Sequence, residues 1–526
     1  MQDKPSAHDG LAAVELRPLL KYLLTNSAVE AHSMFPTYPG GHEAYQKFVV
    51  KGLRDHYKNP AELPSELLDI AERFWRKDLT EVNTLMREVY SPFGPRPRPA
   101  CCMLRSYLLS IALHFSVTKW VAQMRTVPAY AILSGFAFGD TPGVGTFADF
   151  FTRLWQYNER NFSPHEHPPK AKVTKPKKKG EKAASVERVT VSELLRQLEE
   201  HQPSQQQSFS LLFKVFQQEF LNESVDRGLL TPSELALSGD GTPVVTAAQQ
   251  RKKRLCDCKE RGISACDCNR YYSQPDCDIG WDSSRGRFYH GYDLYMLTAS
   301  DSDSDLPVFP LLQPASRHDS HGFLLCFFTM KSFLPDYKVS KLLLDPAHDA
   351  MPIYEYCRKH DIVPFIALNE KRGVKLKYKN DFSIGPDGVP VCMAGLKMRH
   401  DGVELSNHRS KFRCPLMNRQ TKNCSCSNPC SDAKWGRTVH LAMKDNPRLF
   451  NIPPRDSELW KLEYNARTSS ERCNKRLKID FALESGHHRS SKMWYCRLYA
   501  SMMLQHLFAW DLPFIPSLRS ALLAAV

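Results

Sequence analysis

Residues 464–478 read Tyr-Asn-Ala-Arg-Thr-Ser-Ser-Glu-Arg-Cys-Asn-Lys-Arg-Leu-Lys, a polar stretch whose spacing predicts a helix. At about 100° per residue, one face of that helix gathers five side chains within about 40° of a common direction. They are Tyr464, Arg467, Glu471, Lys475 and Lys478. One face therefore carries a carboxylate, three cations and an aromatic ring, which is typical of a surface that faces nucleic acid.

Two aspartates near the ends of apolar runs extend this pattern. Asp240 comes shortly after the run at 235–237, and Asp345 directly follows the run at 342–344. Short apolar runs of this kind predict strands. Together with Glu471, the two aspartates predict a site for two hard divalent cations, Mg²⁺ or Mn²⁺, and phosphodiester chemistry uses such a site.

Each of the three carboxylates also has a local alternative. Asp240 precedes a glycine and so has the character of a turn residue. Asp345 precedes Pro346, which is typical of a helix N-cap. Thr468-Ser-Ser-Glu471 matches a capping box, in which the glutamate bonds to its own helix N-terminus. The order of the three acids and the spacing around Glu471 favour a shared site over three separate local roles.

His318 and Asp319 form a further polar pair ahead of an apolar helix predicted from about residue 322. A cap or loop role is the default for both residues. If the fold brings them close to Asp345, either one becomes a candidate to support the metal ligands.

The overall composition indicates the size of the core and the class of binding partner. The chain has 526 residues, of which 42% are hydrophobic, and a net charge of +14 with a pI near 9.0. This length supports a large core divided into roughly two to four domains. The positive charge favours a polyanionic partner, with nucleic acid ahead of an anionic membrane surface.

The sequence predicts no membrane span and no signal segment. The most apolar stretch, 493–510, is interrupted by Arg497, Gln505 and His506, so we expect a core helix there. The first thirty residues contain no hydrophobic signal core. We therefore expect a cytoplasmic, nucleoid-associated protein whose cysteines are mostly free thiols or metal ligands.

The chain divides by composition into helical, basic and mixed parts. Seven lysines lie between 170 and 182 among several prolines, a composition that cannot bury apolar area. After residue 235 short strands alternate with helices, which predicts an α/β core. The predicted segments are an all-α DNA-binding region (1–162), a basic Lys/Pro linker (163–185), a helical connector (186–230), the first part of the core (231–369) with a Cys-rich loop (254–278), a β-rich or irregular insertion (370–455), and the rest of the core with the Glu471 helix (456–526).

Nine of the sixteen cysteines gather in two short polar segments. The first holds two C-x-C units seven residues apart and is a candidate structural Zn²⁺ site, although C-x-C is tighter than the usual spacing. The second group is a weaker candidate of the same kind, and free thiols are the alternative for both. The first site comprises Cys256, Cys258, Cys266 and Cys268, with Cys277 nearby; the second group is Cys414, Cys424, Cys426 and Cys430.

The spacing Y-x2-R-x3-E-x6-K, met by Tyr464, Arg467, Glu471 and Lys478, resembles the motif of bacterial insertion-sequence transposases of the DDE class. The resemblance extends over 238–510 and reaches the helical front, where Gly-Phe-Ala-Phe (135–138) and Thr-Phe-Ala-Asp-Phe (146–150) look like that family's N-terminal region. It implies a ribonuclease-H-like core, and the long gap between the second aspartate and the glutamate matches members with a β-rich insertion.

The resemblance also implies roles for single residues. Asp240, Asp345 and Glu471 would bind two metal ions, normally Mg²⁺, and Tyr464, Arg467 and Lys478 would hold transposon-end DNA; Lys475 joins them on the helix face. The implied reaction is cleavage at the terminal inverted repeats followed by strand transfer into target DNA, by a dimer assembled on that DNA. Two alternatives are a metal-dependent nuclease without strand transfer and a non-catalytic, transposase-derived, zinc-containing DNA-binding protein.

Overall fold

The computed structural model describes residues 41–57, 59, 63–94, 96–155, 189–248, 260–262, 274, 277–369, 376–377, 382–418, 420–421, 424–427, 429–485, 488–512 and 517–524. These residues form two compact units. The first combines the described residues up to Trp155 with Ser208–Phe220 and those from Trp510 onward; the second contains the rest. The predicted connector and the predicted C-terminal segment thus each contribute to both units.

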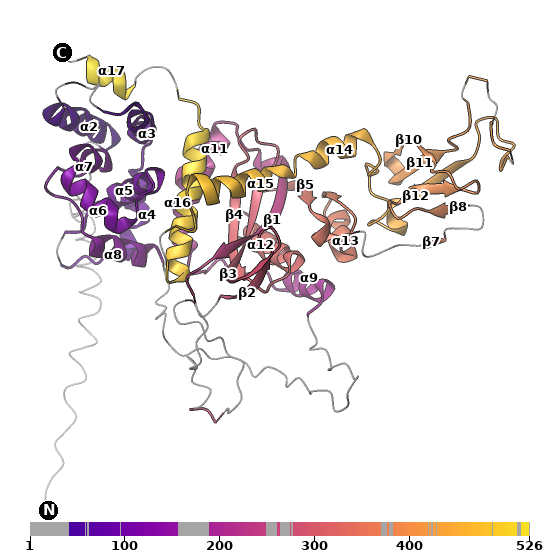
Figure 1. The fold of residues 1–526 in the computed structure, drawn as a ribbon, viewed down its shortest axis with the longest axis horizontal. Coiled ribbons are helices and arrows are strands. Elements are labelled where there is room, and N and C mark those ends of the chain that lie inside the picture. Colours follow the sequence, from indigo (N-terminus) through magenta and orange to yellow (C-terminus); the bar gives the residue numbers. More distant parts are fainter. Residues whose placement is uncertain are drawn as a thin grey trace, which may run out of the picture. The chain divides into compact units, whose positions relative to one another are not determined.

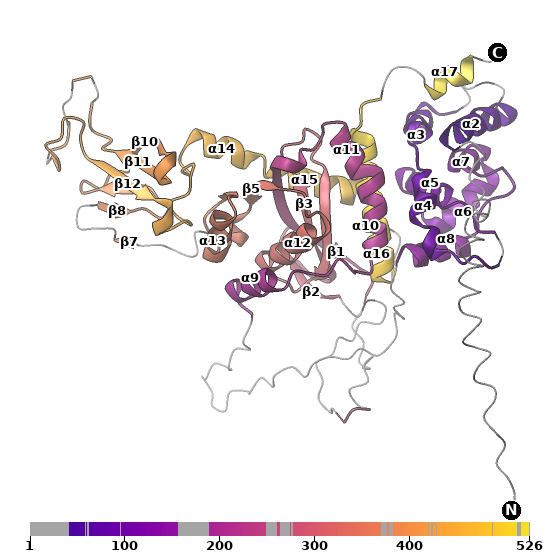
Figure 2. The same ribbon diagram turned by 180° about the vertical axis from the view of Figure 1, so that it is seen from behind.

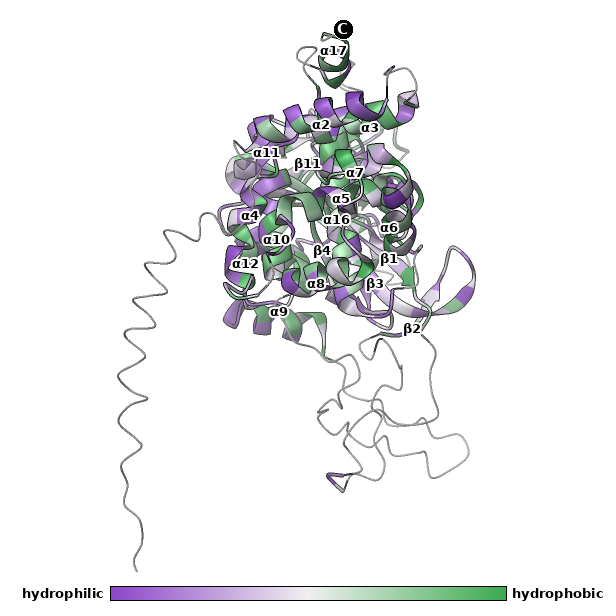
Figure 3. Ribbon diagram, turned by 90° about the vertical axis from the view of Figure 1, so that its left-hand side faces the viewer, coloured by the Kyte–Doolittle hydropathy of each residue, from purple (hydrophilic) through white to green (hydrophobic). Residues whose placement is uncertain are grey.

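The first unit is helical throughout its described residues, in agreement with the predicted all-α front (Figure 1). Hydrophilic and hydrophobic residues alternate along α2 and α3 (Figure 3), so each helix has one face to bury. The helices are α2 (His42–His56), α3 (Ser65–Arg76), α4 (Glu81–Leu85), α5 (Ala100–Ala112), α6 (Val117–Thr126), α7 (Pro128–Ser134), α8 (Val144–Leu154), α10 (Ser210–Phe216) and α17 (Leu518–Leu523), with a 3-10 turn η3 (Arg87–Val89) and the π-turn η4 (Gln217–Leu221).

Aromatic side chains fill the core of this unit. Phe74, Trp120, Phe147 and Phe150 are almost fully buried. α10 joins the unit because five of its seven residues are buried apolar side chains, which leaves it little surface for solvent. Within the described part of the chain, no single helix has the length and apolarity to cross a membrane, although α5 and α6, bent by 103°, pass that test as a pair.

The second unit is built on a six-stranded mixed sheet, which confirms the predicted α/β class. The strand order is β2-β3-β1-β5-β6, and β4 also pairs with β3, along residues 292–298, whereas β2 pairs with residues 287–291 of β3. β1, β5 and β6 are parallel, whereas β2, β3 and β4 pair antiparallel. The strands are β1 (Leu235–Val245), β2 (Asp278–Asp282), β3 (Arg287–Ala299), β4 (Pro307–Pro314), β5 (Val339–Leu344) and β6 (Val363–Ile366).

Helices cover both faces of this sheet. α15 contacts β1 and β3 from one face and α16 contacts β4, while α12 packs on the other face (Figures 1 and 2). The unit's helices are α9 (Val191–Glu200), α11 (Asn222–Asp226), α12 (Asp319–Phe333), α13 (Met351–Lys359), α14 (Glu458–Asn465), α15 (Thr468–Lys475) and α16 (Ser491–Ala509), with short turns η5 (Pro232–Glu234), η6 (Pro346–His348) and η10 (Arg476–Asp480).

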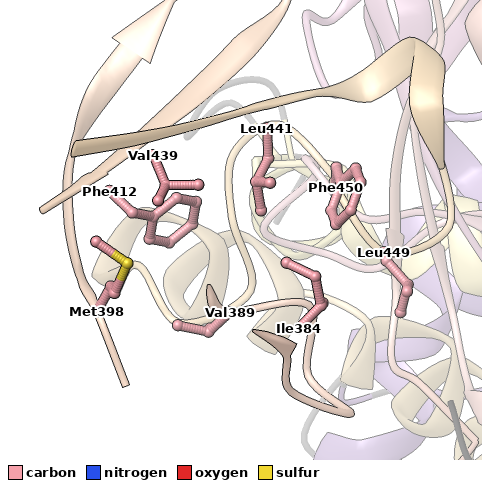
Figure 4. Close-up of a cluster of buried hydrophobic side chains, with 8 residues drawn as sticks. All are labelled: Ile384, Val389, Met398, Phe412, Val439, Leu441, Leu449 and Phe450. Atoms are coloured by element: carbon pink, nitrogen blue, oxygen red, sulfur yellow. The ribbon is translucent and has the colours of Figure 1, made fainter. Parts of the chain in front are cut away.

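Two small sheets lie between β6 and α14, where an insertion was predicted. The shared core of these sheets joins Ile384 and Val389 to Phe412, Leu441 and Phe450 (Figure 4). Their elements are β7 (Leu376–Lys377), β8 (Phe382–Ile384), β9 (Pro390–Cys392), β10 (Arg399–Glu404), β11 (Arg409–Arg413) and β12 (Thr438–Ala442), with turns η8 (Leu405–Asn407) and η9 (Met443–Asp445).

Candidate active site

Backbone pairing brings Asp240 and Asp345 to the same edge of the sheet. β1 and β5 run parallel, and their last paired residues are Gly239 and Leu344. Asp240 and Asp345 are the next residue in each case, so the two carboxylates project from adjacent points. Asp240 itself lies inside β1, opposite Met296 of β3, so the turn alternative for this residue is wrong.

Asp240 is held in a buried, negatively charged environment. Its Oδ2 accepts a hydrogen bond from Asn474 Nδ2 at 3.1 Å. Burial, reinforced by the charge of Asp345, raises the pKa of Asp240 to about 6. The bond from Asn474 and the nearby His348 act in the opposite direction. The carboxylate form of Asp240 is therefore less favourable here than in solvent.

Asp345 is fixed by its own turn. Its Oδ1 accepts from the Ala347 backbone N–H at 3.0 Å, which confirms the predicted N-cap, here of η6. The same oxygen lies 2.5 Å from His348 Nδ1. Burial disfavours the charged form, but the bond and charge of His348 outweigh it and lower the pKa of Asp345. Capping and a metal-facing position are thus compatible for this carboxylate.

A buried chain of hydrogen bonds supports Asp345 from behind. His348 Nε2 lies 2.7 Å from the Tyr295 hydroxyl, and both side chains are fully buried. A carboxylate only accepts hydrogen bonds, so Nδ1 of His348 donates to Asp345, and Nε2 faces the Tyr295 hydroxyl. Gly239 makes room for this hydroxyl, since a Cβ there would lie 2.6 Å from it.

The stretch predicted as one helix, 464–478, is divided among the end of α14, α15 and η10. Ser469 on α15 bonds to Ser238 on β1 at 2.7 Å, and Asn474 reaches Asp240. Glu471 stays half-exposed and forms an ion pair with Arg467 at 2.7 Å. The capping box is not formed, because no side chain caps the N-terminus of α15.

Arg467 links the glutamate to the two aspartates. Its charge lowers the pKa of Asp345 and interacts with Asp240. Its guanidinium lies 5.7 Å from the ring centroid of Tyr464, which stacks on Trp460 at 4.5 Å. The structure therefore brings Asp240, Asp345 and Arg467 together, while the Glu471 carboxylate is engaged by Arg467.

The two predicted lysines differ in environment. Lys475 is exposed. Lys478 is largely buried, donates a hydrogen bond to the Pro243 carbonyl of β1, and lies 3.8 Å from Glu484. Burial lowers the pKa of Lys478, against the opposing charge of Glu484. Lys475 thus faces solvent, whereas Lys478 packs along the strand that carries Asp240.

Three polar residues of this region were missed or left open by the sequence reasoning. Asn474 sits inside the quoted stretch, where a neutral amide carried no signal beside so many charges. Asp293 interrupts the apolar strand β3, a signal that could have been used. Asp319 lies at the first turn of α12, and its charge acts on Asp240. The predicted cap role of His318 is confirmed, because its side chain accepts from the Ser320 backbone N–H.

The candidate zinc ligands Cys256, Cys258, Cys266 and Cys268 lie outside the described residues, as does the Lys/Pro linker. In the later cysteine group, Cys424 forms a β-bridge with Met417, and its thiol interacts with Cys414. Nowhere in the described ranges do three or more His, Cys, Asp or Glu side chains form a ready-made metal-binding group.

Comparison of the chain with protein-family models gives no match, and no curated protein matches it significantly.

Proposed function

We propose that the chain is a DDE-class transposase, an enzyme that cleaves DNA at transposon ends and joins the freed ends to target DNA. The observation that carries the proposal is the placement of Asp240 and Asp345 directly after the last paired residues of the parallel strands β1 and β5. Above them, one side of α15 presents Arg467, Glu471 and Asn474. Phosphodiester chemistry needs this combination of metal-binding carboxylates and phosphate-binding cations.

The strand arrangement supports a ribonuclease-H-like core. Three antiparallel strands lead through α12 to two strands parallel to β1, and the two aspartates lie where the parallel pairing of β1 with β5 ends. The two small sheets between β6 and α14 fit the β-rich insertion expected before the glutamate helix.

The residues present fit two divalent cations such as Mg²⁺ or Mn²⁺. Asp240 and Asp345 raise the energy of each other's charged form, and a cation between them would remove that cost. For Glu471 to become the third ligand, its carboxylate must exchange Arg467 for the metal. When bound, the ions would activate the attacking oxygen and stabilise the leaving 3′ oxygen of an in-line displacement.

The surrounding side chains have definite tasks in this proposal. His348 and Tyr295 hold Asp345 in one orientation, and Asn474 does the same for Asp240. Arg467 offers a planar fork that can pass from Glu471 to a DNA phosphate. Lys475 adds an exposed phosphate contact at the same helix.

The proposal carries the remaining expectations with it. The partners are the terminal inverted repeats and the target duplex, bound by a dimer that pairs two transposon ends. The net charge of +14 supports a DNA partner and a nucleoid-associated, cytoplasmic setting. A structural Zn²⁺ at Cys256, Cys258, Cys266 and Cys268 remains part of the proposal.

Asp240→Asn is the direct test, with a donor plasmid carrying the transposon ends as substrate. Cleavage should be lost while DNA binding is retained, because the amide keeps the size of the side chain but not its charge. Asp456→Asn is a control for the loss of one carboxylate elsewhere, since Asp456 is an exposed carboxyl close to His400 near the insertion. Retained cleavage in Asp240→Asn contradicts the proposal. Cleavage by the wild type without any strand-transfer product would indicate the nuclease alternative instead.

A further inference from the structure

We propose that Asp293 and Asp319 hold a divalent cation on the α12 side of β1, separate from the Asp240–Asp345 pair. Asp293 lies on β3 and Asp319 in the first turn of α12. Both carboxylates approach the backbone of Gly241 closely. A Cβ at position 241 would lie 3.0 Å from Asp293 Oδ1 and 3.2 Å from Asp319 Oδ1. The glycine therefore leaves open a small space that two carboxylates face.

The strand register places Asp293 on the opposite face of the sheet from Asp240. Gly241 pairs with Tyr295 and Pro243 with Asp293, so Asp293 projects from the same face as Gly241. Asp240 is the neighbour of Gly241 along the strand and projects from the opposite face. A cation between Asp293 and Asp319 would thus be distinct from one that is bound by Asp240 and Asp345.

A second observation is an unsatisfied oxygen. The Asp293 side chain is 7% exposed, and its Oδ2 is buried without a hydrogen-bond partner. Buried polar atoms nearly always have a partner, and an isolated buried carboxylate is costly. The oxygen faces a site whose other carboxyl group is Asp319, so a ligand that suits two carboxylates is the missing partner.

The charged groups around the pair leave its negative charge only partly balanced. Asp293 is acted on by Asp319, Asp240 and the positive Lys478. Asp319 is acted on by Asp345 and by two imidazoles, His348 and His318. Lys478 is committed to the Pro243 carbonyl and lies close to Glu484. The carboxylates thus outnumber the firm positive charges, which favours a small divalent ion.

The geometry suits Mg²⁺ or Mn²⁺ in particular. The two Oδ1 atoms lie no more than about 6 Å apart, close enough for small rotations to bring both onto one ion. Mg²⁺ commonly takes only one or two carboxylates and keeps several waters, so this pair is sufficient. Such an ion would place positive charge behind Asp240. Its influence on catalysis rests on the proposed function, whereas its binding does not.

The test is Mn²⁺ binding to the full-length chain, measured by calorimetry and by electron paramagnetic resonance. The starting protein is Asp240→Asn/Asp345→Asn, which lacks the candidate catalytic pair. It should still bind Mn²⁺, and adding Asp293→Asn or Asp319→Asn should weaken that binding tenfold or more. Adding Asp456→Asn, which removes an exposed carboxylate elsewhere, should leave the affinity unchanged.

Two results would overturn the proposal. One is a starting protein that binds no Mn²⁺; the other is undiminished binding after both Asp293 and Asp319 are replaced. The first result would indicate that the two carboxyls share a proton, and the second that Mn²⁺ binds elsewhere in the chain. If Asp293→Asn does not fold, the more exposed Asp319→Asn decides the matter. Retained DNA cleavage in Asp240→Asn would contradict the proposed function only, because the Mn²⁺ measurement does not depend on activity.

Discussion

The two aspartates and the glutamate of the candidate site are positioned by different kinds of interaction. Asp240 and Asp345 follow the last paired residues of two parallel strands, so the sheet itself sets their separation. Glu471 lies on a helix, where the partner of a side chain depends on its conformation, and here it forms an ion pair with Arg467. The positions of the two aspartates are thus fixed by the sheet, while the partners of Glu471 are set by side-chain conformation and can change.

The largest effect on DNA cleavage should come from replacing the aspartates that the sheet positions. If the proposed function holds, Asp345→Asn should lower DNA cleavage by on the order of a thousandfold or more, because it removes a proposed metal ligand. His348→Ala should cost roughly 10- to 100-fold, since it releases the orientation of Asp345 without removing it. Single-turnover cleavage of a labelled transposon end measures both. Equal losses would mean that His348 itself takes part in the chemistry.

Removing Asp240 should change how stability depends on pH in metal-free protein. Its folded pKa of about 6 lies above the unfolded value, so it contributes stability that is present below about pH 4 and lost as pH rises to about 6. Asp240→Asn should remove that loss, on the order of 2 kcal/mol, in urea titrations with a chelator present. Asp345 has a lowered pKa and so acts with the opposite sign, below about pH 4.

A divalent ion should flatten the same pH profile, because it favours the charged form of Asp240. An Asp240→Asn variant with the same slope as the wild type between pH 4 and 6 would show that other carboxyls, such as the buried Asp293, cause the dependence.

The fixed part of the site was the more predictable part. The apolar runs before Asp240 and Asp345 predicted strands. The parallel pairing of these two strands is common in α/β folds. The helix face that carries Glu471 was also predicted. The helical periodicity used for that prediction gives the direction of each side chain but not the residue it contacts. It could not show that Arg467 would bind Glu471 or that Lys478 would turn to Pro243.

Other features depend on tertiary packing and were missed for that reason. The strand predicted at 235–237 extends to Val245, since β3 pairs along the whole length of Gly239–Val245 despite two glycines and a proline. β4 was missed because its prolines weaken the strand signal, yet it lies at the sheet edge, where proline is tolerated. Asp293 and Asp319 meet only because β3 and α12 converge at Gly241.

Arg467→Ala tests the helix face that carries Glu471. We expect two effects of intermediate size, one on DNA binding and one of opposite sign on Mn²⁺ binding. Loss of the guanidinium should weaken binding to transposon-end DNA and reduce the salt slope of log affinity by about one unit. It should also tighten Mn²⁺ binding several-fold, because a positive charge leaves Asp240 and Asp345 and frees Glu471. Fluorescence anisotropy and calorimetry measure the two. Mn²⁺ affinity that falls instead would mean that Arg467 organises the carboxylates.

The smallest effects should separate the two lysines, which share a helix face but not an environment. Lys475→Ala should leave the free energy of unfolding unchanged and reduce the salt slope of DNA binding by about one unit, since an exposed ammonium acts only on phosphate. Lys478→Ala should cost about 1 kcal/mol of stability through its lost bond to Pro243, with less change in the slope. Urea titration and anisotropy over a salt series distinguish them. A full slope change with unaltered stability in Lys478→Ala would mean that DNA draws Lys478 out of its contact with β1, and that this residue too can change partners.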